Sequence, residues 1–318
     1  MGRHLRRGSG VRSAPFPCTS YRALPRPDLW HRRGLDHVAG AAWFGRRLAA
    51  CSLGQEFLLT ASILLETFGM SRRFGGLHAV SDLDLKVHVG EIVGVIGPNG
   101  AGKSTTFNML AGALPPSAGA IHFEGRRMDG LPSHRVAALG IARTFQHNRP
   151  FAGMSLTENV MAGMHLHLHK PLWREIVFSH QAACAEREAA VRADGLLEFV
   201  GLGDFKKADV STLSFGQGRL LEVARCMAAK PKLLLLDEPA AGLTHDECDR
   251  LCEIIRSVAK QGVAVLLIEH DMRLVMGLTE RIVVLNFGRK IADGTPAEIR
   301  VDAGVAAAYL GDNAEGSA

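Results

Sequence analysis

The sequence predicts an α/β fold built around a parallel sheet. Three apolar runs support this prediction, at residues 91–96, 232–237 and 263–268. A continuous apolar run is typical of a parallel strand that is covered on both faces. Glycine, acidic or histidine residues follow these runs, and open α/β sheets bind ligands at the carboxyl ends of their strands. We therefore expect a buried sheet with a functional site at the carboxyl ends of its strands.

The first run leads into a glycine-rich segment with the spacing of a phosphate-binding loop, a glycine, four residues and then Gly-Lys-Ser. Glycines allow a tight turn that points backbone N–H groups inward, and the N-terminus of a following helix through Leu110 attracts an anion. We expect Lys103 to reach the β- and γ-phosphates of a nucleotide and Ser104 to ligate Mg²⁺. The predicted nucleotide-binding residues are Gly97, Pro98, Asn99, Gly100, Ala101, Gly102, Lys103, Ser104 and Thr105.

The second run ends in two adjacent carboxylates, Asp237 and Glu238. We expect Asp237 to bind Mg²⁺ directly or through the water shell of the metal. Glu238 is placed to orient and deprotonate an attacking water. The same residues also fit a core strand that ends in an ordinary acidic turn. The phosphate-binding loop in the same chain favours the metal and base roles.

Two further segments carry weaker signals. Ser214, Gly216 and Gln217 lie at the start of an apolar-periodic helix, where a serine and glycines suit an anion. Taken alone, this pattern fits an ordinary helix cap better. His270 follows the third apolar run, and a lone histidine after a strand is more often structural than catalytic. Neither segment defines a function by itself.

The composition is that of a chain that buries a large core. Of its 318 residues, 47% are hydrophobic and 22% are charged. No apolar run approaches the roughly 18 residues that a membrane-spanning helix needs. The six cysteines show no metal-ligand spacing, so we expect free thiols in a reducing compartment.

The basic charge is concentrated in residues 1–62. This segment holds ten arginines, no lysine and three acidic residues, a net charge of +7 in a chain whose total is +5. The basic pI therefore does not indicate that the rest of the chain binds nucleic acid. We expect this extension to be disordered or to precede the native start of the protein. An amphipathic arm on a membrane surface is the alternative.

In their order along the chain, these motifs resemble the ATPase cassette of ABC transporters, a P-loop NTPase. The resemblance covers about residues 63–311 and adds two site residues. Phe74 is similar to the adenine-stacking aromatic of the family, and Gln146 to its glutamine loop. The implied fold has a small antiparallel β subdomain, a helical insertion at about 149–210 and a tail at 312–318.

A closer resemblance is to the branched-chain amino acid importers, and to the larger of their two ATPase subunits. It is carried by the segments 140–146, 236–243, 267–272, 274–277 and 308–311. Two departures stand out from the family pattern. Phe215 replaces the first glycine of the commonest signature, and Thr244 stands where this subfamily commonly has asparagine.

The resemblance implies that two cassettes bind two ATP molecules at a shared interface. Glu238, His270 and Gln146 are then catalytic, and Mg²⁺ is held by Ser104, Gln146 and Asp237. The signature residues Ser214, Gly216 and Gln217 face the ATP bound by the other cassette.

The partners implied by the resemblance are two polytopic permease subunits, a second related ATPase subunit and a periplasmic solute-binding protein, with no nucleic acid. The location is the cytoplasmic face of the bacterial inner membrane, as a peripheral subunit. Two alternatives stay open. One is a transporter for another small amide, amine or hydrophobic acid, and the other is a regulatory nucleotide-binding module without turnover.

A run of alternate histidines, His165, His167 and His169, lies within the predicted insertion. On a strand these side chains would share one face and could bind a metal ion. No acidic or cysteine ligand lies nearby, so we interpret the run as a polar loop face.

Overall fold

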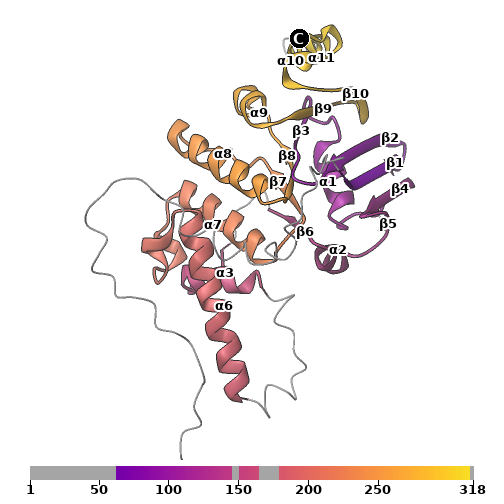
Figure 1. The fold of residues 1–318 in the computed structure, drawn as a ribbon. Helices are drawn as coiled ribbons and strands as arrows, with labels where there is room; N and C mark the ends of the chain where they lie inside the picture. Colours follow the sequence, from indigo (N-terminus) through magenta and orange to yellow (C-terminus); the bar gives the residue numbers. More distant parts are fainter. Residues whose placement is uncertain (1–61, 145–149, 165–178, 316–318) are drawn as a thin grey trace, which may run out of the picture. The chain divides into compact units, whose positions relative to one another are not determined.

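The computed structural model describes residues 62–144, 150–164 and 179–315 (Figure 1). These residues form two β-sheets with helices packed against them, which confirms the predicted α/β fold class. Three predictions concern residues outside the described ranges. They are the nature of the basic extension, the role of Gln146 and the role of the histidine run 165–169.

Within the described residues, the larger sheet has six strands in the order β10-β9-β3-β8-β7-β6. The strands β9, β3, β8, β7 and β6 are parallel, and β10 pairs antiparallel to β9 at one edge. The three predicted apolar runs form β3, β8 and β7 at its centre, and every residue of these strands is buried. The strand bounds are Ile92–Ile96 for β3, Ile141–Arg143 for β6, Leu233–Asp237 for β7, Ala264–Ile268 for β8, Arg281–Asn286 for β9 and Arg289–Gly294 for β10.

Both faces of this sheet are covered, because successive side chains of a strand point to opposite sides. Leu234 and Leu236 of β7 join one hydrophobic cluster, and Leu233 and Leu235 join another. The first cluster also contains residues of several helices. These helices include α6 (Ser179–Phe199), α7 (Phe215–Ala228), α8 (His245–Lys260) and α9 (Met272–Leu278).

The second cluster joins the central sheet to a four-stranded antiparallel sheet in the order β2-β1-β4-β5. Leu65, which is opposite Phe123 on the neighbouring strand, contributes to this core, as does Phe107 of helix α1 (Lys103–Leu110). The structure therefore has three layers, with the central sheet in the middle. The remaining elements of this side are β1 (Ile63–Phe74), β2 (Leu77–His88), β4 (Ala118–Phe123), β5 (Arg126–Arg127) and α2 (Ser133–Leu139).

The described part of the range 149–210 is mostly helical. It contains α3 (Leu156–Ala162), α6, the short 3₁₀ turn η3 (Gly203–Phe205) and the first residue of a second such turn, η4 (Val210–Thr212). Ser155 caps α3, since its hydroxyl accepts from the Glu158 N–H while the Glu158 carboxylate accepts from the Ser155 N–H. The chain ends in α10 (Pro296–Val301) and α11 (Ala303–Glu315). No helix in the described ranges is long and apolar enough to cross a membrane.

Two glycines, one just after a helix and one within a helix, should respond oppositely to substitution by alanine. At Gly163, just after α3, a Cβ would collide with the Arg225 carbonyl of α7, whereas Gly195 in α6 faces open space. We expect Gly163→Ala to lower the free energy of unfolding by about 1–3 kcal/mol through overpacking. Gly195→Ala should raise it by about 0.5–1 kcal/mol, because alanine loses less backbone entropy in a helix. Urea unfolding of both variants measures the difference, and equal effects would contradict the packing of α3 on α7.

The cysteines should differ in reactivity. Cys184 is exposed, whereas burial raises the pKa of Cys226 to about 12 and that of Cys252 to about 11. Because the thiolate is the nucleophile, iodoacetamide at pH 8 should modify Cys184 while Cys226 and Cys252 react only after denaturation. Peptide mass spectrometry of the native and urea-treated protein checks this, and rapid native labelling of Cys252 would contradict the buried face of α8.

Candidate active site

The phosphate-binding loop connects the end of β3 to the start of α1, as the sequence predicts. Gly97 and Gly102 have φ angles of 149° and 98°, values that residues with a side chain rarely adopt. A Cβ at Gly97 would collide with the Leu285 carbonyl of β9, and a Cβ at Gly102 with the Ala79 carbonyl of β2. Glycine is therefore required at both ends of the loop by the strands that surround it.

Lys103 lies across this loop. Its Nζ donates to the carbonyl oxygens of Gly97 at 2.6 Å and Pro98 at 2.9 Å. Burial lowers the pKa of this ammonium, and the carboxylates of Glu238 and Asp237 oppose the shift. The lysine thus sits between the loop and the two predicted acidic residues, with its charge available to a phosphate.

The acidic pair lies at the end of β7, beside β8. The side chain of Asp237 is only 1% exposed, and its Oδ2 accepts from Nη2 of Arg143 at 2.9 Å. Its Oδ1 is buried and has no hydrogen-bond partner within the described ranges. Glu238 is half-buried and has a φ of 48°, a left-handed conformation that is uncommon for a residue with a side chain.

The oxygen donors at this site suit Mg²⁺, which prefers carboxylates, hydroxyls and water. The free Oδ1 of Asp237 is one such donor. The exposed Ser104 in the first turn of α1 is another. A buried carboxylate oxygen without a partner is costly, and a metal ion or its water would satisfy it.

His270 follows β8 with an exposed side chain, and the residue before it makes a contact that the sequence does not predict. Glu269 is 1% exposed, and its carboxylate accepts from the backbone N–H of Ala240 at 2.8 Å and of His270 at 3.2 Å. Burial raises the pKa of Glu269, and these N–H donors partly offset the shift. Glu269 therefore joins the segment after Glu238 to the segment that carries His270.

The predicted signature residues form a cap at the start of α7. Ser214 Oγ accepts from the Gln217 N–H at 3.2 Å, and Gln217 Oε1 accepts from the Ser214 N–H at 2.9 Å. A Cβ at Gly216 would collide with the Glu247 carboxylate of α8. The side-chain hydrogen bonds that the structure describes for Ser214 and Gln217 join these two residues to each other and not to the phosphate-binding loop of the same chain.

The structure also defines the surroundings of three further residues, Phe74, Thr244 and Tyr309. Phe74 is exposed at the end of β1, with the Arg72 guanidinium 4.8 Å from the centre of its ring. Thr244 caps α8, since its hydroxyl accepts from the Glu247 N–H at 3.4 Å. Burial raises the pKa of Tyr309, on α11, and the nearby backbone N–H of Gly97 partly opposes this shift. The sequence does not predict this link between the last helix and the phosphate-binding loop.

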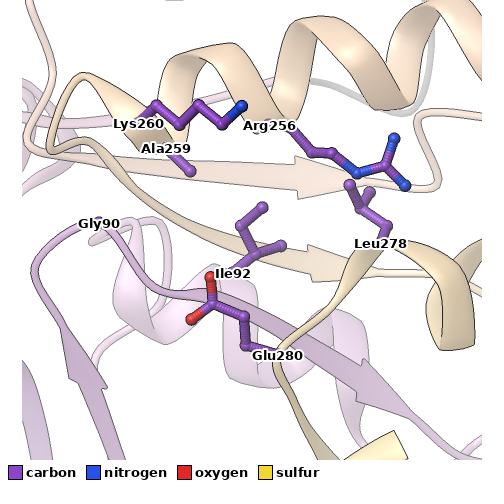
Figure 2. A pocket seen from close by; sticks show the side chains of 7 residues that line it. All are labelled: Gly90, Ile92, Arg256, Ala259, Lys260, Leu278 and Glu280. Atoms are coloured by element: carbon purple, nitrogen blue, oxygen red, sulfur yellow. The ribbon is translucent and has the colours of Figure 1, made fainter.

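A separate hollow of about 290 Å³ lies where the strands of the central sheet begin (Figure 2). Arg256 and Lys260 of α8 extend along one side of it, and Glu280 lies across from them. Gly90 and Ile92 place this hollow at the amino end of β3. Open parallel sheets bind ligands at the carboxyl ends of their strands. The phosphate-binding loop, Asp237, Glu238 and His270 lie at or just after the carboxyl ends of β3, β7 and β8.

Comparison with known protein families agrees with this geometry. Residues 80–241 match the ABC transporter family, and residues 289–315 match the branched-chain amino acid ATP-binding cassette transporter family. The second match contains Tyr309.

Curated relatives match across nearly their whole length. The high-affinity branched-chain amino acid transport ATP-binding protein BraF of Pseudomonas aeruginosa is 45% identical over 250 residues, which span 78% of this chain and 98% of that protein. LivG of Escherichia coli, with the same descriptive name, is 43% identical over the same shares of the two chains.

Solved structures lead to the same family. A nucleotide-free ATP-binding cassette from an ABC transporter superposes with a TM-score of 0.69 at 28% identity, over 78% of this chain and 99% of that chain. A cassette of an ABC transporter in its ADP conformation gives the same TM-score at 27% identity, over 79% of this chain and 99% of that one. The chain belongs to the ATP-binding subunits of ABC transporters, in the family of the branched-chain amino acid transport ATP-binding proteins.

Proposed function

We propose that this protein hydrolyses ATP to power a membrane importer for branched-chain amino acids. The observation that carries the ATPase activity is the proximity of Lys103 to Asp237 and Glu238 at the carboxyl ends of β3 and β7, which lie on either side of β8. The substrate class is supported by the relatives of 43–45% identity, whose names specify branched-chain amino acid transport.

The loop residues Gly97–Thr105 bind the phosphates of ATP in this proposal. Lys103 Nζ exchanges its two carbonyl acceptors for oxygens of the β- and γ-phosphates, which a cation stabilises far better than neutral carbonyls do. The exposed ring of Phe74 stacks on the adenine. Ser104, Asp237 and Gln146 hold Mg²⁺, which when bound offsets the negative charge of the phosphates.

Glu238 is the proposed general base. Its backbone N–H donates to the Ile268 carbonyl at 3.0 Å, so the residue is fixed against β8, and its carboxylate lies close enough to Lys103 to oppose the lowering of that lysine's pKa by burial. A carboxylate in that position accepts a proton from the water that attacks the γ-phosphate. The exposed side chain of His270 contacts the γ-phosphate in this proposal. Gln146 senses Mg²⁺ and transmits the state of the nucleotide to the permease.

Ser214, Gly216 and Gln217 face a second ATP, bound by another cassette. The exposed hydroxyl of Ser214 at the start of α7 supports this role, because a helix N-terminus attracts phosphate. The proposed assembly contains two permease subunits, a related ATPase and a periplasmic solute-binding protein, with this chain on the cytoplasmic face of the inner membrane. Closure of the two cassettes and their reopening after hydrolysis drive the permease between its states.

Purification from membranes in mild detergent, followed by mass spectrometry, tests the assembly. Two polytopic permeases, a second ATPase and a leucine-binding type of receptor are expected, and uptake of radiolabelled leucine by the reconstituted complex should require ATP. Co-purification with a permease and receptor that import another small amide, amine or hydrophobic acid would correct the substrate. Recovery of the protein alone, without ATPase activity, would favour a regulatory nucleotide-binding module.

Glu238→Gln should lower the steady-state rate of phosphate release by about 10²-fold or more, because a general base contributes on that order. Binding of a fluorescent ATP analogue should be retained, since the phosphate-binding loop is unchanged. Glu253→Gln, an exposed position on α8, is the matched control. Persistent turnover in Glu238→Gln at the rate of the control would overturn the assignment of the base.

Glu269→Gln should lower kcat for ATP hydrolysis by about tenfold with little change in KM. The glutamine amide would place N–H donors opposite one of the N–H groups of Ala240 and His270, and a buried donor without an acceptor costs about 1–3 kcal/mol. Steady-state kinetics measure the two constants. A raised KM at unchanged kcat would show that Glu269 supports nucleotide binding rather than the segments around Glu238 and His270.

A further inference from the structure

Arg143, the last residue of β6, lies between two elements of the active site. Its Nη2 donates to Oδ2 of Asp237 at 2.9 Å, and its Nη1 donates to Oδ1 of Asn108 at 2.6 Å. Asp237 is 94 residues away along the chain and Asn108 is 35 residues away. A guanidinium presents its donors in a rigid planar fork, so one side chain fixes both partners at once.

The arrangement leaves the two oxygens of Asp237 in different states. Oδ2 is held by Arg143, while Oδ1 is buried and has no hydrogen-bond partner among the residues that the structure describes. The backbone N–H of Asp237 also donates to Oγ1 of Thr144, next to Arg143. Residues 143 and 144 therefore restrict both the backbone and the carboxylate of Asp237, with Oδ1 left for another ligand.

The second arm of Arg143 reaches the helix that begins with the phosphate-binding residues. Asn108 follows Ser104 by four residues on α1, so the two side chains lie on the same face of the helix. Ser104 and Asp237 are the residues of the described ranges proposed to hold Mg²⁺. Arg143 thus ties together the two elements, α1 and β7, that carry these ligands.

We propose that Arg143 is a positioning residue for Mg²⁺. It holds Oδ2 of Asp237, so that Oδ1 is presented to the metal or to a water of its shell. Through Asn108 it also sets the position of this carboxylate relative to the Ser104 face of α1. Because the Arg143 guanidinium is always charged, it also neutralises Asp237 before the metal and nucleotide arrive. The inference rests on the proposed function, since it specifies how the same site acquires its metal.

The test is a titration of MgCl₂ against the full-length protein and a fixed concentration of N-methylanthraniloyl-ADP, with binding followed by fluorescence. Arg143→Met should raise the Mg²⁺ concentration at half-maximal binding about tenfold or more, as is typical when a partner of a metal ligand is removed. Binding of the same nucleotide in EDTA should stay close to that of the wild type. This separation distinguishes a metal-positioning role from a general loss of structure, which would weaken both.

Two further variants refine the test. Arg143→Lys keeps the charge but reaches only one partner, so its Mg²⁺ midpoint should lie between those of the wild type and Arg143→Met. It also provides the comparison if the methionine variant does not fold, as judged by thermal unfolding. Arg127→Met removes an exposed arginine paired with Asp129 and is the matched control, for which no shift is expected.

Asn108→Ala supplies a double-mutant cycle. In the wild-type background it should raise the Mg²⁺ midpoint, and in the Arg143→Met background it should add little, because both changes act through the same side chain. An unshifted midpoint in Arg143→Met, or fully additive effects of the two substitutions, would overturn the role of Arg143. A wild-type protein that binds the nucleotide equally well with and without Mg²⁺ would instead contradict the proposed metal site itself.

Discussion

Burial of both faces of the central parallel sheet is the constraint on which the rest of the structure depends. It selects the apolar runs that become β3, β7 and β8, and it places these strands side by side in parallel. Ile268 of β8 is level with Val95 of β3 and with Asp237 of β7, so the three strands end at the same height. The glycine loop, the acidic pair and His270 therefore lie at the same end of the sheet, because each is at or just after the carboxyl end of a buried strand.

Two carboxylates at this end of the sheet, those of Asp237 and Glu269, are buried as well. Their hydrogen bonds hold neighbouring segments together. Asp237 is held by Arg143, and the Glu269 carboxylate accepts N–H groups from Ala240 and His270. A buried carboxylate without such partners would cost several kcal/mol. Oδ1 of Asp237 is the exception among these carboxylate oxygens, because it is buried without a hydrogen-bond partner in the part of the chain that the structure describes. In the proposed function this oxygen is the one that binds the metal.

The phosphate-binding loop is shaped from outside as much as by its own glycines. Carbonyls of Ala79 and Leu285 crowd Gly102 and Gly97, and Gly288 donates its N–H to the Ala101 carbonyl at 3.1 Å. The backbone N–H of Gly97 also opposes the rise in the pKa of Tyr309 that burial causes, so this tyrosine of the last helix lies near the loop. The loop is therefore bounded by β2 of the antiparallel sheet and by β9 and the turn after it in the central sheet. The last helix lies in the segment 289–315, which matches the branched-chain amino acid ATP-binding cassette transporter family.

The sequence by itself determined the central strands, the glycine loop and the acidic pair, because each depends on local periodicity and spacing. The Ser214–Gln217 cap also follows a local pattern, a serine followed by glutamine three residues later. Tertiary structure alone decided which distant side chains meet. The hydrogen bonds of Arg143 with Asp237 and of Glu269 with Ala240 join segments that are far apart in the sequence. The hydrophobic pattern of one segment cannot predict such contacts. They form only when segments that are far apart in the sequence pack next to each other.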